Sequence, residues 1–83
     1  GIKGKLREIK IEDNSPSIGK AIYELKLPLD YVIMLISRDG EYIQPNGSTV
    51  LKEGDILISL SEDEVYETAQ TMLNKQRTTL EDA

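Results

Sequence analysis

The 83-residue chain contains no cysteine, no histidine, no phenylalanine and no tryptophan. The lack of cysteine and histidine excludes disulfides, the usual zinc sites, a catalytic cysteine and a Ser-His-Asp triad. A folded core must be aliphatic, because the four aromatic residues are all tyrosines. We therefore expect no enzymatic activity, no metal site and no resident cofactor.

Long apolar runs and an excess of positive charge are also lacking. No segment approaches the roughly 18 apolar residues that a transmembrane helix needs, and no signal-peptide pattern opens the chain, so we expect a soluble chain. Fifteen acidic residues against ten basic ones give a net charge of −5. This balance disfavours nucleic-acid binding, which depends on basic groups that displace counterions from phosphates.

The composition that remains is typical of one small globular domain, with 39% apolar and 30% charged residues. Residues 6–12 alternate between apolar and polar, which predicts an amphipathic strand. After a turn-forming segment, apolar residues recur at spacings of four and three. They predict a helix of about two turns that begins near Ser17 and is stopped by Pro28.

Three strands are predicted next, with the first, second and third turns at residues 39–40, 45–48 and 52–55. Residues 31–37 form an apolar, β-branched segment typical of a central strand that is covered on both faces. Asp39-Gly40 predicts a tight hairpin, because both central positions of such a turn need positive φ. Strands at 41–44 and 56–60 follow, and their short connections favour antiparallel pairing. The residues interpreted as structural turn positions are Gly40, Gly47, Gly54 and Asp55.

The last predicted element is a helix that begins with a capping box. The Ser61 hydroxyl can accept from the Glu64 N–H, and the Glu64 side chain can reach back. The buried stripe of this helix is expected to be Val65, Ala69, Met72 and Leu73.

These elements together predict an α+β fold of two layers, in which two helices cover one face of a mostly antiparallel four-stranded sheet in the order β-α-β-β-β-α. Residues 1–5 are interpreted as a linker or as residues left by cloning, 6–74 as the domain and 75–83 as a polar tail.

Five short motifs follow one another in a fixed order. They are Ser17-Ile18-Gly19-Lys20, Glu24-Leu25-x-Leu27-Pro28, Ile36-Ser37-Arg38-Asp39-Gly40, Pro45, and Leu51-x-x-Gly54-Asp55 before an apolar strand. This ordered set resembles the TrkA-C domain, also called RCK-C, of bacterial K⁺-transport regulators. The resemblance covers roughly residues 6–72.

The resemblance implies a cytosolic regulatory domain of a monovalent-cation (K⁺ or Na⁺)/proton antiporter or of a K⁺ transport system. Such a domain lies on the cytoplasmic side of the bacterial inner membrane, in the same polypeptide as the transporter. It would act as a homodimer, with a small ligand held at the subunit boundary in some members. The nucleotide-binding partner domain has no counterpart here, since no GxGxxG follows a strand, so NAD and ATP binding are not implied.

The candidate ligand or dimer interface lies around the end of the first predicted helix. Apolar residues at a helix exit remain exposed unless a partner covers them, and a twofold copy would do so. Arg38, at the hairpin, is a candidate contact to a ligand or to the transporter, although an exposed turn explains it as well. The candidate residues are Leu25, Leu27, Pro28, Leu29, Tyr31, Val32, Ile33, Arg38 and Pro45.

Some members of the family bind cyclic di-AMP through an Arg and an Asn between the first helix and the central strand. The matching segment here, residues 27–32, contains neither residue type. A dianionic ligand would lack its charge-assisted hydrogen bonds there, so cyclic di-AMP is disfavoured as a ligand.

A second hypothesis is a carrier or adaptor β module of the lipoyl-like kind, for which residues 51–55 are also typical. That class needs an acceptor lysine at an exposed hairpin tip, and the tip at Asp39-Gly40 has none.

Overall fold

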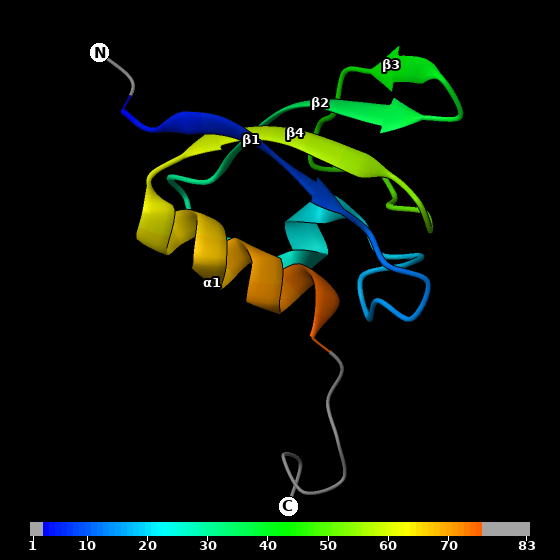
Figure 1. Ribbon diagram of the computed structural model, residues 1–83. Helices are drawn as coiled ribbons and strands as arrows, with labels where there is room; N and C mark the ends of the chain where they lie inside the picture. The colour runs from blue at the N-terminus through cyan, green and yellow to red at the C-terminus, as the bar shows by residue number, and fades with distance from the viewer. Residues whose placement is uncertain (1–2, 76–83) are drawn as a thin grey trace, which may run out of the picture.

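A computed structural model describes residues 3–75 and shows a single antiparallel sheet with helical segments on one side (Figure 1). The strand order across the sheet is β1-β4-β2-β3. The predicted α+β class and the four strands are confirmed. The elements are β1 (Lys5–Lys10), η1 (Ile22–Leu25, a 3₁₀ turn), β2 (Val32–Arg38), β3 (Glu41–Ile43), β4 (Ile56–Ser61) and α1 (Asp63–Asn74).

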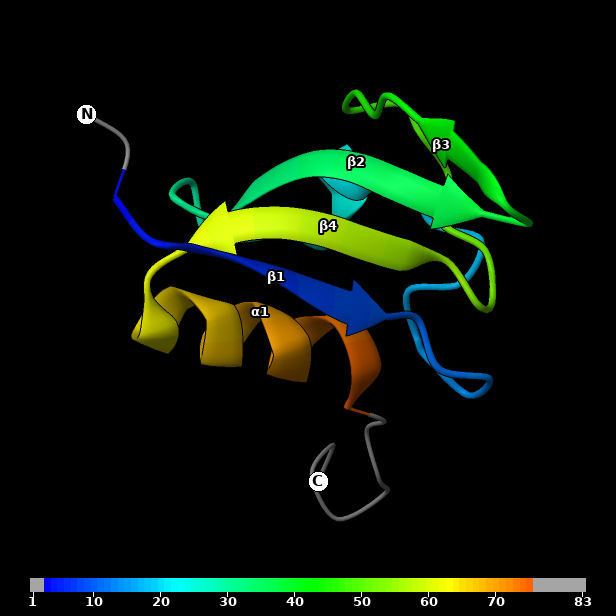
Figure 2. The same ribbon diagram turned by 45° about the horizontal axis from the view of Figure 1, so that its top comes forward.

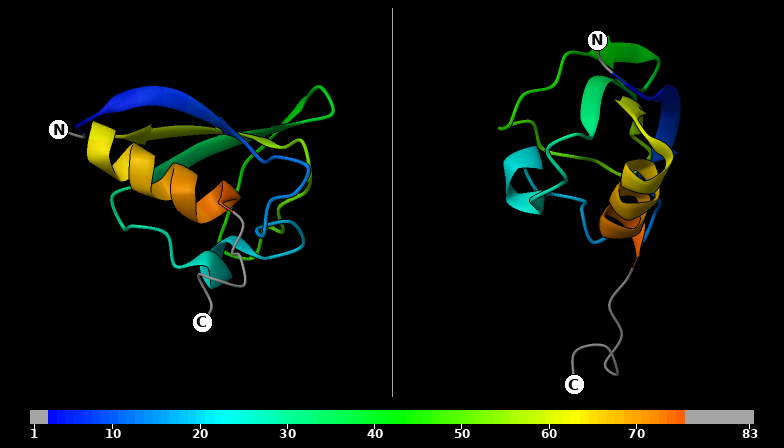
Figure 3. Two further views of the ribbon diagram at one scale, coloured as in Figure 1. Left: turned by 60° about the horizontal axis from the view of Figure 1, so that its bottom comes forward. Right: turned by 90° about the vertical axis from the view of Figure 1, so that its left-hand side faces the viewer.

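The core lies between the sheet and the layer formed by α1 and η1 (Figures 1 and 3). Ile9, Ile36 and Leu57 point from three adjacent strands towards Ala69 and Leu73 of α1, and all five are buried. The core is aliphatic, as the composition predicts. Of the predicted α1 stripe, Ala69 and Leu73 are buried, Val65 is half-buried, and Met72 is exposed.

The opposite face of the sheet carries no layer from residues 3–75, and Figure 2 shows the strands bare on that side. The prediction that the central strand is covered on both faces is therefore wrong. One α-helix and one 3₁₀ turn can cover only one face of a four-stranded sheet, and Val32 and Met34 stay 37% and 46% exposed. We call this surface the open sheet face; its apolar members are Leu6, Val32, Leu35, Ile56, Ile58 and Leu60.

One half of β2 forms a free edge. The short strand β3 pairs only with Ile36–Arg38 of β2, so residues 32–35 have a strand neighbour on the β4 side alone. The β2–β4 register also shifts between Ile33 and Leu35. Such bulges are common at sheet edges, where they bend the strand and increase its twist.

The predicted first helix is replaced by turns and the single 3₁₀ turn η1, which corrects the number of helices from two to one. The backbone around Gly19 and Lys20 pairs with another segment, because the Gly19 N–H donates to the Leu51 carbonyl and the Leu51 N–H donates to the Lys20 carbonyl. The hydroxyls of Ser15 and Ser17 donate to the Leu73 carbonyl in the last turn of α1. Long-range bonds therefore replace the local helical ones.

The predicted capping box at Ser61 is also wrong. Ser61 ends β4 and pairs with Lys5, and the N-cap of α1 is Glu62, whose carbonyl accepts from the Tyr66 N–H. Gly4 explains part of this arrangement, since a Cβ there would lie 2.4 Å from the Ser61 carbonyl carbon. Strand pairing thus extends through Ser61, so this residue belongs to β4 and does not cap the helix.

The predicted hairpin between β2 and β3 has the required backbone. Asp39 and Gly40 have φ values of 50° and 82°, and Gly54 has 83° in the third turn. Gly47 lies in a turn, as predicted, but without a positive φ. Of the predicted tail, residues 76–83 lie outside the described residues.

A two-point ion pair fixes the C-terminal end of β2 to the turn before β4. Arg38 Nε and Nη2 donate to the two oxygens of Asp55 at 2.8 and 2.7 Å, and Nη2 also donates to the Val50 carbonyl. Asp55 is 1% exposed and accepts a further bond from the Lys52 N–H at 2.9 Å. Burial alone would raise the pKa of Asp55, but these hydrogen bonds and the charge of Arg38 hold it below the usual value.

We expect Arg38→Met to lower the free energy of unfolding at pH 7 by about 2–4 kcal/mol, because it leaves the Asp55 charge buried and unpaired. In the wild type the depressed pKa of Asp55 gives stability that is present above its unfolded pKa and is lost as the pH falls through the folded pKa. In the variant the unpaired carboxyl has a raised pKa, so protonation favours the folded state. Urea unfolding from pH 7 to pH 3 should therefore show the gap between the two proteins shrinking; a constant gap contradicts this account.

Candidate functional site

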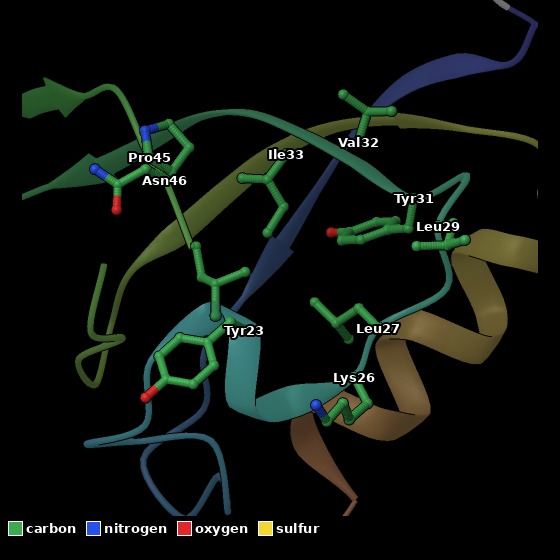
Figure 4. Close-up of a pocket in the computed structure, with 10 residues that line it drawn as sticks. Tyr23, Lys26, Leu27, Leu29, Tyr31, Val32, Ile33, Pro45 and Asn46 are labelled. Atoms are coloured by element: carbon green, nitrogen blue, oxygen red, sulfur yellow. The ribbon is translucent and has the colours of Figure 1, made fainter. Parts of the chain in front are cut away.

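An apolar pocket of about 680 Å³ opens beside the free half of β2 (Figure 4). Its wall comes from η1 and the segment after it, from the start of β2, and from the loop after β3. The lining residues are Ile22, Tyr23, Lys26, Leu27, Leu29, Tyr31, Val32, Ile33, Pro45 and Asn46. Pockets of this size that combine an apolar lining with a few polar groups are typical of small-molecule or partner sites.

Most of the predicted interface residues meet in this pocket, namely Leu27, Leu29, Tyr31, Val32, Ile33 and Pro45. The remaining three do not line it. Leu25 lines a groove against the end of α1, Pro28 lies in the connection between η1 and β2, and Arg38 is held in its pair with Asp55. Arg38 thus has a structural role, and its contact to a ligand or to the transporter stays a prediction.

Four lining residues were not predicted: Ile22, Tyr23, Lys26 and Asn46. Ile22 and Tyr23 fall within the predicted first helix, and nothing in the local pattern separates a helix from a 3₁₀ turn here. Asn46 was interpreted as a turn residue, and only the long-range bond from the Tyr23 N–H to the Gly47 carbonyl brings its loop beside η1. Lys26 is the only cation among the lining residues, and Asn46 is the only amide.

Lys26 has an uncommon backbone conformation. It follows η1 with φ 52° and ψ 44°, a left-handed geometry that glycine adopts without strain and that other residues adopt at a cost of about 1–2 kcal/mol. Figure 4 shows its side chain beside Leu27 at the lower margin of the pocket. Lys26 is the C-cap of η1, and left-handed residues are common at helix C-termini, so its backbone has a structural explanation. Its place at the pocket margin is what makes it a candidate contact.

Tyr31 places a phenol at the wall of the pocket. The residue is 6% exposed, and its hydroxyl has no hydrogen-bond partner, although Ser59 lies close enough to affect it. Burial raises the pKa of Tyr31 to about 12, more than Ser59 lowers it, so the phenol stays protonated at neutral pH. In Figure 4 its hydroxyl points into the space between the side chains of Ile33 and Leu27. The pocket wall therefore contains an unpaired neutral donor.

Metal chemistry has no counterpart in residues 3–75, where no group of three or more acidic side chains is placed to hold an ion. Within the same residues, no helix has the length and apolar character needed to cross a membrane.

The chain is similar in sequence to a known domain family and to one of its curated members. The model of the TrkA-C domain matches residues 6–74. The chain is 40% identical over 65 residues to the Trk system potassium uptake protein TrkA homolog of Archaeoglobus fulgidus, which covers 76% of this chain. The chain spans 15% of the length of that relative.

Solved structures with the same fold include RCK and RCK_C domains. An RCK domain with cda is 26% identical and superposes with a TM-score of 0.74, covering 87% of this chain and all of the other. The RCK_C domain dimer of S. agalactiae BusR in complex with c-di-AMP is 27% identical, with a TM-score of 0.72, covering 81% of this chain and 92% of the other. BusR has also been solved with its busAB-promotor DNA, where the match covers 34% of the longer chain.

We expect Tyr31→Phe to leave the free energy of unfolding unchanged or to raise it by about 1 kcal/mol, because the variant removes a buried donor that has no partner. Tyr66→Phe is the matched control. Its hydroxyl donates to the Glu8 carbonyl at 2.9 Å, and its loss should cost up to about 1 kcal/mol. Urea unfolding measures both variants, and a larger loss for Tyr31→Phe than for Tyr66→Phe contradicts the assignment.

Proposed function

Because the chain belongs to the TrkA-C domain family, we propose that it is a cytosolic regulatory domain of a K⁺ or other monovalent-cation transport system. The K⁺-uptake relative supports the transport context, and the scarcity of catalytic side chains favours a regulatory role over an enzymatic one. The domain belongs to the same polypeptide as its transport unit in this proposal, and cation/proton antiport is the favoured type of transport.

The observation that carries the proposal is the apolar pocket at the free edge of β2. Leu29 is fully exposed at its rim and Tyr23 is 63% exposed, although both are large apolar side chains. A second copy related by a twofold axis would cover both residues. The BusR relative with a similar fold was solved as a dimer, which supports the same mode of assembly here.

Regulation follows from the position of the pocket at the proposed subunit boundary. A ligand that fits the pocket better in one dimer geometry shifts the population towards that geometry by its differential affinity. The attached transport unit then responds to the change in the dimer, without chemistry on the ligand.

A cyclic dinucleotide is the candidate ligand that a specific observation now favours. The sequence disfavours it because residues 27–32 lack Arg and Asn, yet Lys26 and Asn46 supply a cation and an amide at the same pocket from outside that segment. Two copies would offer two ammonium groups to the two phosphates. A Lys ammonium attracts a phosphate mainly by its charge and, unlike Arg, does not donate two parallel hydrogen bonds to it. The affinity for the dinucleotide should therefore depend strongly on salt.

We expect Leu29→Glu to weaken association at least tenfold and to halve the mass of the main species, because it places two carboxylates in an apolar contact. Sedimentation velocity at 5–200 µM measures the effect. Met72→Gln, a change at an exposed apolar residue on α1 outside the pocket, serves as the control and should leave the mass unchanged. An unchanged mass for Leu29→Glu contradicts the proposed dimer surface.

We expect c-di-AMP to raise the melting temperature of the wild type by several degrees at low salt, and we expect Lys26→Gln to abolish that rise. Lys26→Gly separates ligand binding from folding: glycine relieves the left-handed strain, so this variant should gain about 1 kcal/mol of stability and still lose the response to ligand. A wild type that does not respond to c-di-AMP, or a full response in both variants, overturns the role of Lys26.

A further inference from the structure

The open sheet face has an inverted pattern of polarity. In a sheet with one solvated face, polar residues normally point outward and apolar residues inward. In β4 the inward-pointing residues are Leu57 and two buried serines, Ser59 and Ser61, whereas the outward-pointing row is entirely aliphatic. The register places this row between Leu6, on β1, and Leu35, on β2. The result is a contiguous apolar surface with no layer from residues 3–75 above it.

This surface differs from the pocket described above. The pocket lies on the helical side of the free edge of β2, while the centre of the open sheet face lies on β4, and the face extends to β1 at the opposite edge of the sheet (Figure 2). Leu6 is 67% exposed, and Tyr42, outward-pointing on β3, is 70% exposed. Contiguous exposed apolar surfaces of this kind mark interaction sites.

The charges on β1 indicate which partner fits this face. Glu8 and Lys10 point to the same side as Leu6, because side chains alternate along a strand. No ion pair is recorded for either side chain within residues 3–75. A partner of one charge sign would satisfy one of them and repel the other. A second copy satisfies both, because an antiparallel β1 laid over the first places each acid opposite a base.

We propose that the open sheet face is a second homotypic interface, on which two copies pack sheet against sheet with Glu8 of each copy opposite Lys10 of the other. Two sheets packed in this way lie about 10 Å apart, a gap that long Glu and Lys side chains at the margin can bridge. Under twofold symmetry the ion pair forms twice. Together with the pocket contact this gives two isologous contacts, which close four copies into a tetramer when their twofold axes cross at right angles.

The proposal is tested by reversing these charges in the Leu29→Glu background and measuring the affinity of self-association. In that background the pocket contact is removed and only the open sheet face associates. Sedimentation should show a dimer in that background. Glu8→Lys and Lys10→Glu should each weaken this dimer by about tenfold, since each replaces two attractive contacts with two repulsive ones. The double variant Glu8→Lys/Lys10→Glu should restore the affinity to within about threefold, because the pair is only exchanged.

Glu67→Lys is the matched control, since it makes the same change of charge at an exposed position of α1 and should have no effect. Carbodiimide cross-linking of a mixture of ¹⁴N- and ¹⁵N-labelled chains adds a direct readout, because a mixed-isotope Glu8–Lys10 cross-link forms only between copies. A monomeric Leu29→Glu background overturns this second interface and leaves the pocket dimer standing. If the single reversals weaken association and the double variant does not restore it, Glu8 and Lys10 do not pair between copies. That result overturns the proposal as well.

Discussion

The coverage of the sheet is the constraint on which the other properties of this domain depend. A four-stranded sheet has two faces to bury, and residues 3–75 provide one α-helix of twelve residues and one 3₁₀ turn to cover them. A chain of this size buries only about 60% of the surface that its unfolded form exposes, so apolar surface is left over. It is left at two places, the free edge of β2 and the open sheet face. Both places have features that a second copy of the chain would satisfy.

The interior shows how the covered face is held together despite this shortage. Small polar residues also face the helix, as with the buried Ser59, whose hydroxyl donates to the Arg7 carbonyl. Arg7 also bonds to Asp63 and lies 4.6 Å over the ring of Tyr66, which attaches β1 to α1. The aliphatic bulk that would strengthen a monomer is placed on the outer row of β4. This placement supports the proposed association of two copies.

Local pattern predicted those parts of the fold that local interactions determine. The strands and the Asp39-Gly40 hairpin follow from alternation, β-branching and turn chemistry, and six of nine predicted interface residues line one pocket. Two of the errors share one cause, which is pairing between distant segments. The bonds that join residues 19–20 to Leu51 replaced a helix, and the pairing of Ser61 with Lys5 replaced a capping box. Lys26 was missed because the local pattern does not separate the 3₁₀ turn that it ends from a longer helix.

β2 connects the two surfaces. Its C-terminal end is fixed to the third turn by the pair between Arg38 and Asp55. Its N-terminal half has a bulge and, among residues 3–75, no strand neighbour on one side. Val32 lies in this free half, lines the pocket and points to the open sheet face. A change in the pocket therefore acts on a strand segment that can adjust relative to a fixed end, and the same segment forms part of the outer surface. In the proposed assembly the two contacts share Val32, so occupation of the pocket and packing on the open sheet face are expected to bias each other by equal free energies.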